Sequence, residues 1–236
     1  YIDGRIFWDP LMPEIPLKER YALYKAANRE LANLHNINFK QIKLENYGKP
    51  GNYFSRQISR WSSQYKSSET RTIKEMDNLI SWLPSSIPEQ ERTSIVHGDF
   101  RIDNIIFHPS EPRVLAVLDW ELSTLGDPLS DFTYHLMQWK TPPGVRGGFD
   151  SLKLRDYGIP EFKEYIKLYC ERTNRDQITN LDFYFSFNVF RLAAIIQGVY
   201  ARALNGNASN RKAIEMGEMV HPLAKLSWKF AIKAGA

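Results

Sequence analysis

Apolar residues recur along most of the chain at intervals of three or four positions, which is the spacing of an amphipathic helix. Residues 17–35 are the clearest case, because Leu23, Ala27, Leu31 and Leu34 form one apolar stripe. The same spacing, together with flanking Pro, Gly and capping residues, predicts further helices along the chain. These cover residues 52–65, 70–83, 128–139, 160–173, 181–205 and 210–233.

Some of these segments carry additional expectations. We expect Asn52 to cap the helix that follows it and Pro222 to kink the last helix. Residues 181–205 are apolar on nearly every side, which predicts a helix at the centre of its domain. Residues 140–159 are rich in Pro and Gly and show no periodicity, so we expect a lid or binding loop there.

One stretch departs from the helical pattern. Two short apolar runs, residues 104–107 and 114–118, are separated by a Pro-containing turn at residues 108–113, and this arrangement predicts a β-hairpin. With helices on both sides of it in the sequence, the expected fold class is α+β and mostly helical, built around one short hairpin.

Acidic and amide side chains stand at the ends of the predicted hairpin. Asp99 and Asn104 come at the beginning of its first strand, and Asp119 directly follows its second strand. In a hairpin, the start of the first strand lies beside the end of the second, so these three side chains can converge. Oxygen donors of this kind suit Mg²⁺, which is usually held by one or two carboxylates plus substrate phosphates.

Composition sets only broad limits. The chain has 236 residues, 43% of them hydrophobic and 25% charged, which fits one large globular domain or two small ones. The net charge of +4 fits an enzyme for anionic substrates such as nucleotides or acyl-CoA, but it equally fits no special partner. We find no compact Lys/Arg run that would indicate a nucleic-acid surface. We also find no apolar stretch long enough for a membrane span and no signal peptide.

A single cysteine, Cys170, excludes an intramolecular disulfide. It favours a reducing compartment, so we expect a cytoplasmic protein.

The hairpin region carries a recognisable set of motifs. His97-Gly98-Asp99, followed by Asn104 five residues after the aspartate, resembles the H-x-D-x-x-x-x-N catalytic loop of kinases. The His-Gly-Asp form is similar to that of the aminoglycoside phosphotransferase family of small-molecule kinases. Asp119-Trp120-Glu121 stands where protein kinases carry Asp-Phe-Gly, and Gly126-Asp127-Pro128 with Asp131 completes the family's pattern.

The amino-acid sequence of the two motifs resembles that of one subgroup in particular. It is similar to the kinase-like domain fused to, or encoded beside, certain acyl-CoA dehydrogenases, whose members are thought to phosphorylate hydroxyacyl substrates. The resemblance implies a protein-kinase-like fold. Its small N-terminal lobe would carry a Gly-rich phosphate loop and a nucleotide-binding Lys. The only Gly cluster here, residues 144–148, follows no predicted strand, so we expect residues 1–236 to be the large C-terminal lobe alone.

The resemblance also implies roles for individual residues. Asp99 would be the general base for the attacking hydroxyl. Asn104 and Asp119 would hold Mg²⁺ and, through it, the phosphates of ATP or GTP. Taken singly, Asn104 could instead be a turn residue and Asp119 a strand-end cap. Arg101 would stabilise the transferred phosphate or, about equally well, form a surface salt bridge.

Neighbouring residues are expected to support this site. His97 would orient the loop by hydrogen bonding, and Glu121 would contact either the metal's outer ligands or the substrate. Asp127 is expected to be a helix N-terminal carboxylate. Asp131 would either brace the catalytic loop or help to line the acceptor site, with a structural role favoured.

For the acceptor, we expect a pocket between the loop at 140–159, the helix from Asn52 and the long apolar helix. Its aromatic and aliphatic character suits an acyl substrate better than a polycationic sugar, although such residues are more often simply core. The candidate lining residues are Arg56, Arg60, Trp61, Arg191, Gln197 and Tyr200.

The leading hypothesis is therefore a kinase that uses ATP or GTP and Mg²⁺ to phosphorylate a hydroxyl of a small molecule, with a hydroxyacyl-CoA as one candidate acceptor. The alternative is a pseudokinase or binding module that uses the pocket without turnover. A protein kinase is less favoured, because no Ala-Pro-Glu segment follows Asp119. The sequence does not indicate the oligomeric state.

Overall fold

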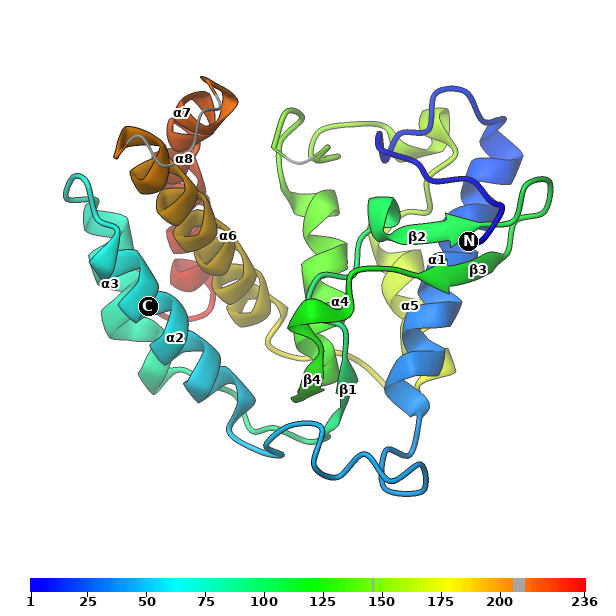
Figure 1. The fold of residues 1–236 in the computed structure, drawn as a ribbon, viewed down its shortest axis with the longest axis horizontal. Helices are drawn as coiled ribbons and strands as arrows, with labels where there is room; N and C mark the ends of the chain where they lie inside the picture. Colours follow the sequence, from blue (N-terminus) through cyan, green and yellow to red (C-terminus); the bar gives the residue numbers. More distant parts are fainter. Residues whose placement is uncertain (146, 206–210) are drawn as a thin grey trace. The chain divides into compact units, whose positions relative to one another are not determined.

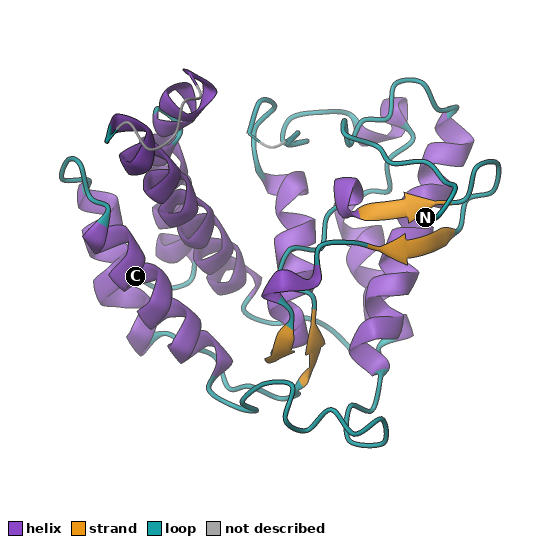
Figure 2. Ribbon diagram, viewed as in Figure 1, coloured by secondary structure: helices purple, strands orange, loops and turns teal. Residues whose placement is uncertain are grey.

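The computed structural model describes residues 1–145, 147–205 and 211–236, except for the side chains of residues 211 and 212. The chain folds into helices and a few short strands, as the predicted α+β class requires (Figures 1 and 2). It divides into two compact units. Unit 1 comprises Tyr1–Gly51 and Arg92–Thr179, and unit 2 comprises Asn52–Glu91 and Asn180–Ala236.

Unit 1 is built on α1 (Leu17–Asn36), α4 (Pro128–Leu136) and α5 (Phe162–Arg172). Helix α1 packs against α5, as its apolar stripe predicts. Helix α4 meets α5 through an aromatic contact: the ring of Phe132 in α4 stacks on the ring of Tyr169 in α5, with centroids 3.8 Å apart. Because both side chains are fully buried, this stack fixes α4 relative to α5.

The predicted hairpin is present in unit 1, with strand ends within one residue of those expected. Strand β2 (Ile105–Phe107) pairs antiparallel with β3 (Val114–Val117). A second antiparallel pair, β1 (Ser94–Val96) with β4 (Thr124–Gly126), was not predicted. Strand β1 precedes the hairpin in sequence and β4 follows it. The loop between β1 and the hairpin, and the segment between the hairpin and β4, are therefore each anchored at both ends by paired strands.

The N-terminal segment of unit 1 is tied to the hairpin. Arg5 and Phe107 exchange two backbone hydrogen bonds, of 2.8 and 2.9 Å. Phe7 is buried, whereas Trp8, one residue further, is 81% exposed. The start of the segment that leads to α1 is thereby fixed to the hairpin.

The predicted helix at 128–139 ends earlier as an α-helix and continues as a 3₁₀ turn, η4 (Met137–Lys140). Residues 140–159 contain another such turn, η5 (Leu154–Tyr157). Phe149 from this loop is buried against Trp139, with ring centroids 5.3 Å apart. The described part of the loop is therefore anchored in the core of unit 1. The remaining 3₁₀ turns are η1 (Leu83–Ser85), η2 (Ile102–Asn104) and η3 (Trp120–Leu122).

Unit 2 is helical in all its described elements. Helix α6 (Leu181–Leu204) contacts α2 (Tyr53–Ser67), α7 (Arg211–Gly217) and α8 (Val220–Lys233), so the predicted apolar helix is central to this unit. The remaining helix, α3 (Lys74–Trp82), packs on α8.

Two local predictions for unit 2 were wrong. The last helix is not kinked at Pro222: it is divided at residues 218–219, and Pro222 lies in the first turn of α8, where its missing N–H costs no helical hydrogen bond. Asn52 does occupy the N-cap position of α2, but its backbone is left-handed and its side chain makes no capping hydrogen bond. Residue 210, the expected start of the last helix, lies outside the described residues. Among the described helices, none is long and apolar enough to cross a membrane.

Candidate active site

The loop after β1 is hydrogen-bonded to helix α4. The buried carboxylate of Asp131 accepts a 2.8 Å hydrogen bond from the backbone N–H of Gly98 and another from that of His97. Burial alone would raise the pKa of Asp131. The hydrogen bond and charge of His35 and these backbone N–H groups outweigh it and leave the pKa below its ordinary value. Of the two roles expected for Asp131, the structure shows the bracing of this loop.

His97 links the loop to the end of the hairpin. Its Nδ1 accepts a hydrogen bond from the backbone N–H of Asp99 at 3.2 Å, so its Nε2 carries the proton and donates to the carbonyl of Leu118 at 2.8 Å. Because Leu118 directly precedes Asp119, the imidazole fixes the distance between the backbones at 99 and 119. Both ring nitrogens are thus engaged, which is consistent with the predicted orienting role of His97.

Asp99 is held on both of its carboxylate oxygens. Oδ1 accepts a 2.7 Å hydrogen bond from the hydroxyl of Tyr134, and Oδ2 accepts a 3.2 Å hydrogen bond from the side-chain amide of Asn104. The guanidinium Nε of Arg101 lies 3.7 Å from Oδ1. The side chain is 18% exposed, so it remains accessible to a ligand.

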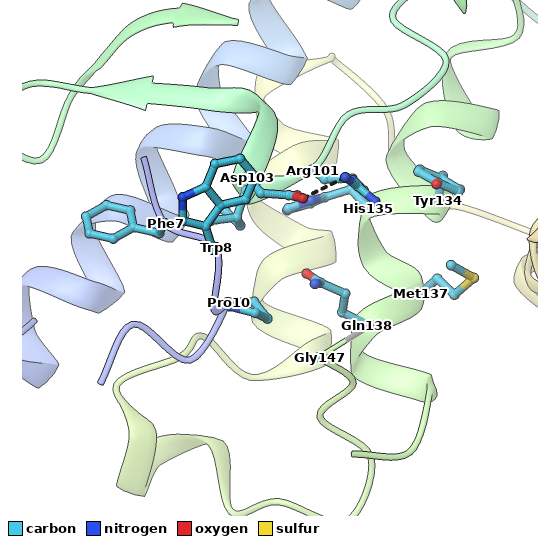
Figure 3. A pocket seen from close by; sticks show the side chains of 11 residues that line it. Phe7, Trp8, Pro10, Arg101, Asp103, Tyr134, His135, Met137, Gln138 and Gly147 are labelled. Atoms are coloured by element: carbon cyan, nitrogen blue, oxygen red, sulfur yellow. Dashed lines mark hydrogen bonds and ion pairs between the residues drawn. The ribbon is translucent and has the colours of Figure 1, made fainter. Parts of the chain in front are cut away.

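Arg101 is shared between two carboxylates. Besides its contact with Asp99, it donates a 2.6 Å hydrogen bond to Asp103 (Figure 3). Asp103 and Tyr134 were not predicted as site residues. For Tyr134 a signal existed: it lies three residues after Asp131, and this spacing puts both side chains on the same face of α4.

Asn104 and Asp119 lie at neighbouring ends of the hairpin. The carbonyl of Asn104 accepts a 2.8 Å hydrogen bond from the N–H of Leu118, and the next residue pair along the strands is Ile105 with Val117. Asp119 has a left-handed backbone, with φ of 65°, at the first residue beyond this ladder. A non-glycine residue held in this conformation often marks a functional position.

The donor set of these two residues fits a hard cation. The amide nitrogen of Asn104 is engaged with Asp99, which leaves the oxygen Oδ1 as the group available for a metal. The carboxylate of Asp119 is exposed, and within the described residues no hydrogen bond engages it. Two oxygen ligands are what Mg²⁺ commonly takes from a protein when phosphates supply others. Clusters of three or more His, Cys, Asp or Glu side chains are absent from the described part of the chain, and metal binding by Asn104 and Asp119 stays a prediction.

The two remaining acidic residues differ in role. Asp127 is the N-cap of α4 and accepts a 2.8 Å hydrogen bond from the N–H of Leu129, as expected for a helix N-terminal carboxylate. It thereby fixes the start of the helix that carries Asp131. Glu121 lies in η3 and is exposed, and its predicted contact with metal or substrate stays a prediction.

A cavity of about 250 Å³ lies within unit 1 (Figure 3). Arg101 and Tyr134 line it, and both contact Oδ1 of Asp99. The N-terminal segment forms one wall and α4 with η4 the opposite wall. The other lining residues are Phe7, Trp8, Pro10, Ile102, Asp103, His135, Met137, Gln138 and Gly147.

The chain was compared with known protein families, curated proteins and solved structures. The family model described as "phosphotransferase enzyme family" matches residues 1–165. A crystal structure from Ralstonia eutropha JMP134, of a protein assigned to the aminoglycoside phosphotransferases, is 48% identical with a TM-score of 0.95. The match covers 99% of this chain and 71% of that one. The chain belongs to the phosphotransferase enzyme family.

Curated relatives of this phosphotransferase chain are larger proteins. Acyl-CoA dehydrogenase family member 10 of Mus musculus is 44% identical over 237 residues, which cover all of this chain and 22% of that protein. Acyl-CoA dehydrogenase family member 11 of Gallus gallus is 43% identical over 230 residues, covering 95% of this chain and 30% of that protein. The chain thus spans less than a third of the length of either relative.

More distant structures share the kinase-like fold of this phosphotransferase chain. A choline kinase from Cryptosporidium parvum Iowa II has a TM-score of 0.60 at 12% identity, and the match covers 100% of this chain and 71% of that one. At this identity the likeness concerns the fold alone. The predicted family, the kinase-like fold and the similarity to proteins named as acyl-CoA dehydrogenase family members are therefore confirmed.

The residues predicted to line the acceptor pocket all lie in unit 2, whereas Asp99 lies in unit 1. Within unit 2, the guanidinium groups of Arg60 and Arg191 lie 5.2 and 5.5 Å from the ring centre of Trp61. Gln197 donates a 2.6 Å hydrogen bond to the carbonyl of Ser68. These contacts account for Trp61, Arg191 and Gln197 as packing residues of unit 2.

Two further residues of that set are less enclosed. The side chains of Arg56 and Tyr200 are partly exposed. The ring of Tyr200 lies against Gly217, where a Cβ would come within 2.2 Å of it. An acceptor-binding role for all of these residues stays a prediction.

Proposed function

We infer that this chain transfers the γ-phosphate of ATP or GTP to a hydroxyl group of a small molecule, with Mg²⁺ as the metal. The observation that carries this inference is the Asp99 carboxylate, held on one oxygen by Tyr134, which lines a cavity, and on the other by Asn104. Membership of the phosphotransferase family supports the same reaction class.

Asp99 would act on the acceptor. Its partly exposed carboxylate would accept the proton of the attacking hydroxyl or orient that hydroxyl toward the phosphate. General-base catalysis of this kind typically contributes about 10²–10⁴-fold in rate. The two hydrogen bonds on Asp99 keep the carboxylate in place, which matters because phosphoryl transfer depends mainly on positioning.

Asn104 and Asp119 would hold the metal. When bound, Mg²⁺ would neutralise charge on the β- and γ-phosphates of the nucleotide. The protein's contribution is the hairpin, which keeps the two residues on adjacent strand ends, and His97, which ties the loop of Asp99 to the same end. Arg101 would add positive charge near the transferred phosphate, although part of its charge is balanced by Asp103.

The cavity in unit 1 is the site we propose for the acceptor hydroxyl, because two of its wall residues contact Asp99 directly. Its walls combine aromatic and aliphatic side chains with a few polar groups, which suits an acyl chain that carries a hydroxyl. At about 250 Å³ it lies below the size of common small-molecule pockets, so it would take only the hydroxylated end of a long substrate.

A hydroxyacyl-CoA, or the free hydroxy acid, is therefore the acceptor class we propose. The relatives named as acyl-CoA dehydrogenase family members support an acyl substrate, since a kinase segment within such a protein would act on related compounds. The residues of unit 2 around Trp61 remain a separate, second candidate for binding the acceptor.

The test is nucleotide-dependent phosphorylation by the full-length protein that contains this chain. A panel of hydroxy acids and their CoA thioesters is incubated with ATP or GTP and Mg²⁺, and phosphorylated product is detected by mass spectrometry. We expect product with the wild-type protein and none above background with Asp99→Ala. Binding of nucleotide without any product from the whole panel would favour the pseudokinase alternative.

A further inference from the structure

Helix α4 reaches the catalytic loop at two points. Asp131 accepts hydrogen bonds from the loop backbone at His97 and Gly98, and Tyr134, one turn further along α4, donates from its hydroxyl to Oδ1 of Asp99 at 2.7 Å. The first contact holds the backbone, and the second holds the side chain that the proposed reaction uses. The two contacts come from the same helix face, so they act as one rigid support.

The Tyr134 hydroxyl occupies a distinctive place. Tyr134 is 3% exposed and belongs to the wall of the cavity (Figure 3), and its hydroxyl donates to Oδ1 of Asp99, so it links the cavity wall to this carboxylate. Oδ2 of Asp99 is held separately by the amide of Asn104 at 3.2 Å. An aspartate with only one oxygen held can still rotate its carboxylate about the Cβ–Cγ bond. With a donor on each oxygen, the plane of the carboxylate is fixed.

We propose that Tyr134 is a positioning residue that fixes the Asp99 carboxylate in the orientation needed to receive the acceptor's hydroxyl proton. The inference rests on the proposed function, because it assigns Tyr134 a role that works through Asp99. Tyr134 does not itself exchange a proton with the substrate: its hydroxyl hydrogen stays on the Asp99 bond throughout. Its effect is therefore on the rate of the chemical step and not on nucleotide binding.

A purely structural role for Tyr134 predicts something different. As a buried ring on α4, it would contribute packing and stability, and removing its hydroxyl would affect folding without any link to Asp99. The two roles are separated by asking whether the effect of the hydroxyl disappears when Asp99 can no longer act as a base.

The experiment is a double-mutant cycle in the full-length protein with Tyr134→Phe and Asp99→Asn, assayed with ATP, Mg²⁺ and whichever hydroxy acid or CoA thioester the wild-type protein phosphorylates. Phenylalanine keeps the ring and removes only the donor. We expect Tyr134→Phe to lower kcat by roughly ten- to a hundredfold, with the KM for nucleotide unchanged. In the Asp99→Asn background we expect the same substitution to change the residual rate by less than about twofold.

Tyr21→Phe is the matched control. The Tyr21 hydroxyl also donates to a carboxylate, that of Glu164, in the same unit, but it is neither in the cavity wall nor in contact with Asp99. We expect this variant to keep the wild-type kcat. Nucleotide affinity, measured for each variant by calorimetry, verifies that each one is folded.

The outcomes separate the two proposals. A wild-type kcat in Tyr134→Phe, or an equal loss in the wild-type and Asp99→Asn backgrounds, would overturn the positioning role and leave the phosphotransferase function standing. A wild-type protein that phosphorylates nothing would overturn both.

Discussion

The side-chain amide of Asn104 donates to Asp99 twice, to its backbone carbonyl at 2.9 Å and to its carboxylate Oδ2 at 3.2 Å. This contact joins the proposed base to one of the proposed metal ligands. It also orients the amide, because the nitrogen faces Asp99 and the oxygen faces away from it. Asn104 therefore serves two neighbours with chemically different ends of one side chain.

This arrangement makes an unusual prediction for Asn104→Asp. The substitution keeps an oxygen for the metal, but it replaces the donor with a second negative charge beside the Asp99 carboxylate. We expect kcat to fall on the order of a hundredfold, because repulsion between the two carboxylates moves Asp99 out of position. Steady-state kinetics at saturating Mg²⁺ measures this. Retained activity would show that the amide N–H is dispensable.

Asp119→Asn tests the other ligand. The amide keeps the size and an oxygen but loses the formal charge, so we expect the apparent Mg²⁺ affinity in a metal titration of activity to weaken by about tenfold or more. Asp150→Asn is the matched control, since Asp150 is an exposed acid of the same unit that is not part of the cavity wall. An unchanged Mg²⁺ requirement in Asp119→Asn would contradict the metal assignment.

The cavity makes a prediction about substrate binding. Trp8 lines the cavity although it is mostly exposed, so removing its indole takes away one wall without emptying the core. We expect Trp8→Ala to raise the KM for the acceptor about tenfold and to leave the KM for nucleotide unchanged. Tyr47→Ala is the comparison, because Tyr47 is also an exposed aromatic residue of unit 1 but is not in the cavity wall. Equal effects on both substrates would argue against the cavity as the acceptor site.

Stability should depend on Asp131 in a pH-dependent way. Its pKa is lowered in the folded protein, so its stabilising effect is complete above the unfolded-state pKa and is lost as the pH falls through the folded-state pKa. We expect Asp131→Asn to lower the free energy of unfolding by roughly 2–4 kcal/mol at pH 7, since it leaves buried N–H groups poorly paired. Urea unfolding should show this difference shrinking below about pH 4. A difference independent of pH would contradict a charged Asp131.

His135 adds to this loss of stability in acid. Burial lowers its pKa to about 4, so the imidazole stays neutral in the folded protein while the unfolded chain takes up a proton below its ordinary value of 6.5. Lowering the pH from 7 to 5 should therefore cost about 2 kcal/mol of unfolding free energy through His135 alone. His135→Gln should lose this part of the pH dependence, as measured by urea unfolding at the two pH values.

Local patterns in the sequence predicted much of this fold and site. The helix starting at Leu17 and the hairpin strands were predicted to within a residue, because each has a periodic apolar pattern or a turn signal. The hairpin brings the backbone of Asn104 beside Leu118, the residue before Asp119, because the backbone hydrogen bonds of a hairpin fix that neighbourhood. The orienting role predicted for His97 stays a prediction, supported by its hydrogen bond to the carbonyl of Leu118.

Tertiary pairing was harder to predict. Strands β1 and β4 are three residues each, too short for any alternation to stand out, and they lie about 30 residues apart in sequence. The hydrogen bond between Tyr134 and Asp99 joins residues 35 positions apart. A tyrosine on an apolar helix is expected to be a buried packing residue, so the sequence did not indicate this contact. The cavity gathers residues from four separate segments, which no sequence pattern relates to one another.

The central claim is that Asp99 activates a hydroxyl for attack on a metal-bound nucleotide. Single-turnover phosphoryl transfer from Mg²⁺-ATP to a hydroxylated acyl acceptor, by wild-type protein and by Asp99→Asn, measures this step directly. We expect the transfer rate of Asp99→Asn to be about 10²–10⁴-fold lower, with nucleotide affinity unchanged. Equal transfer rates for the two proteins, with nucleotide bound to both, would contradict the account.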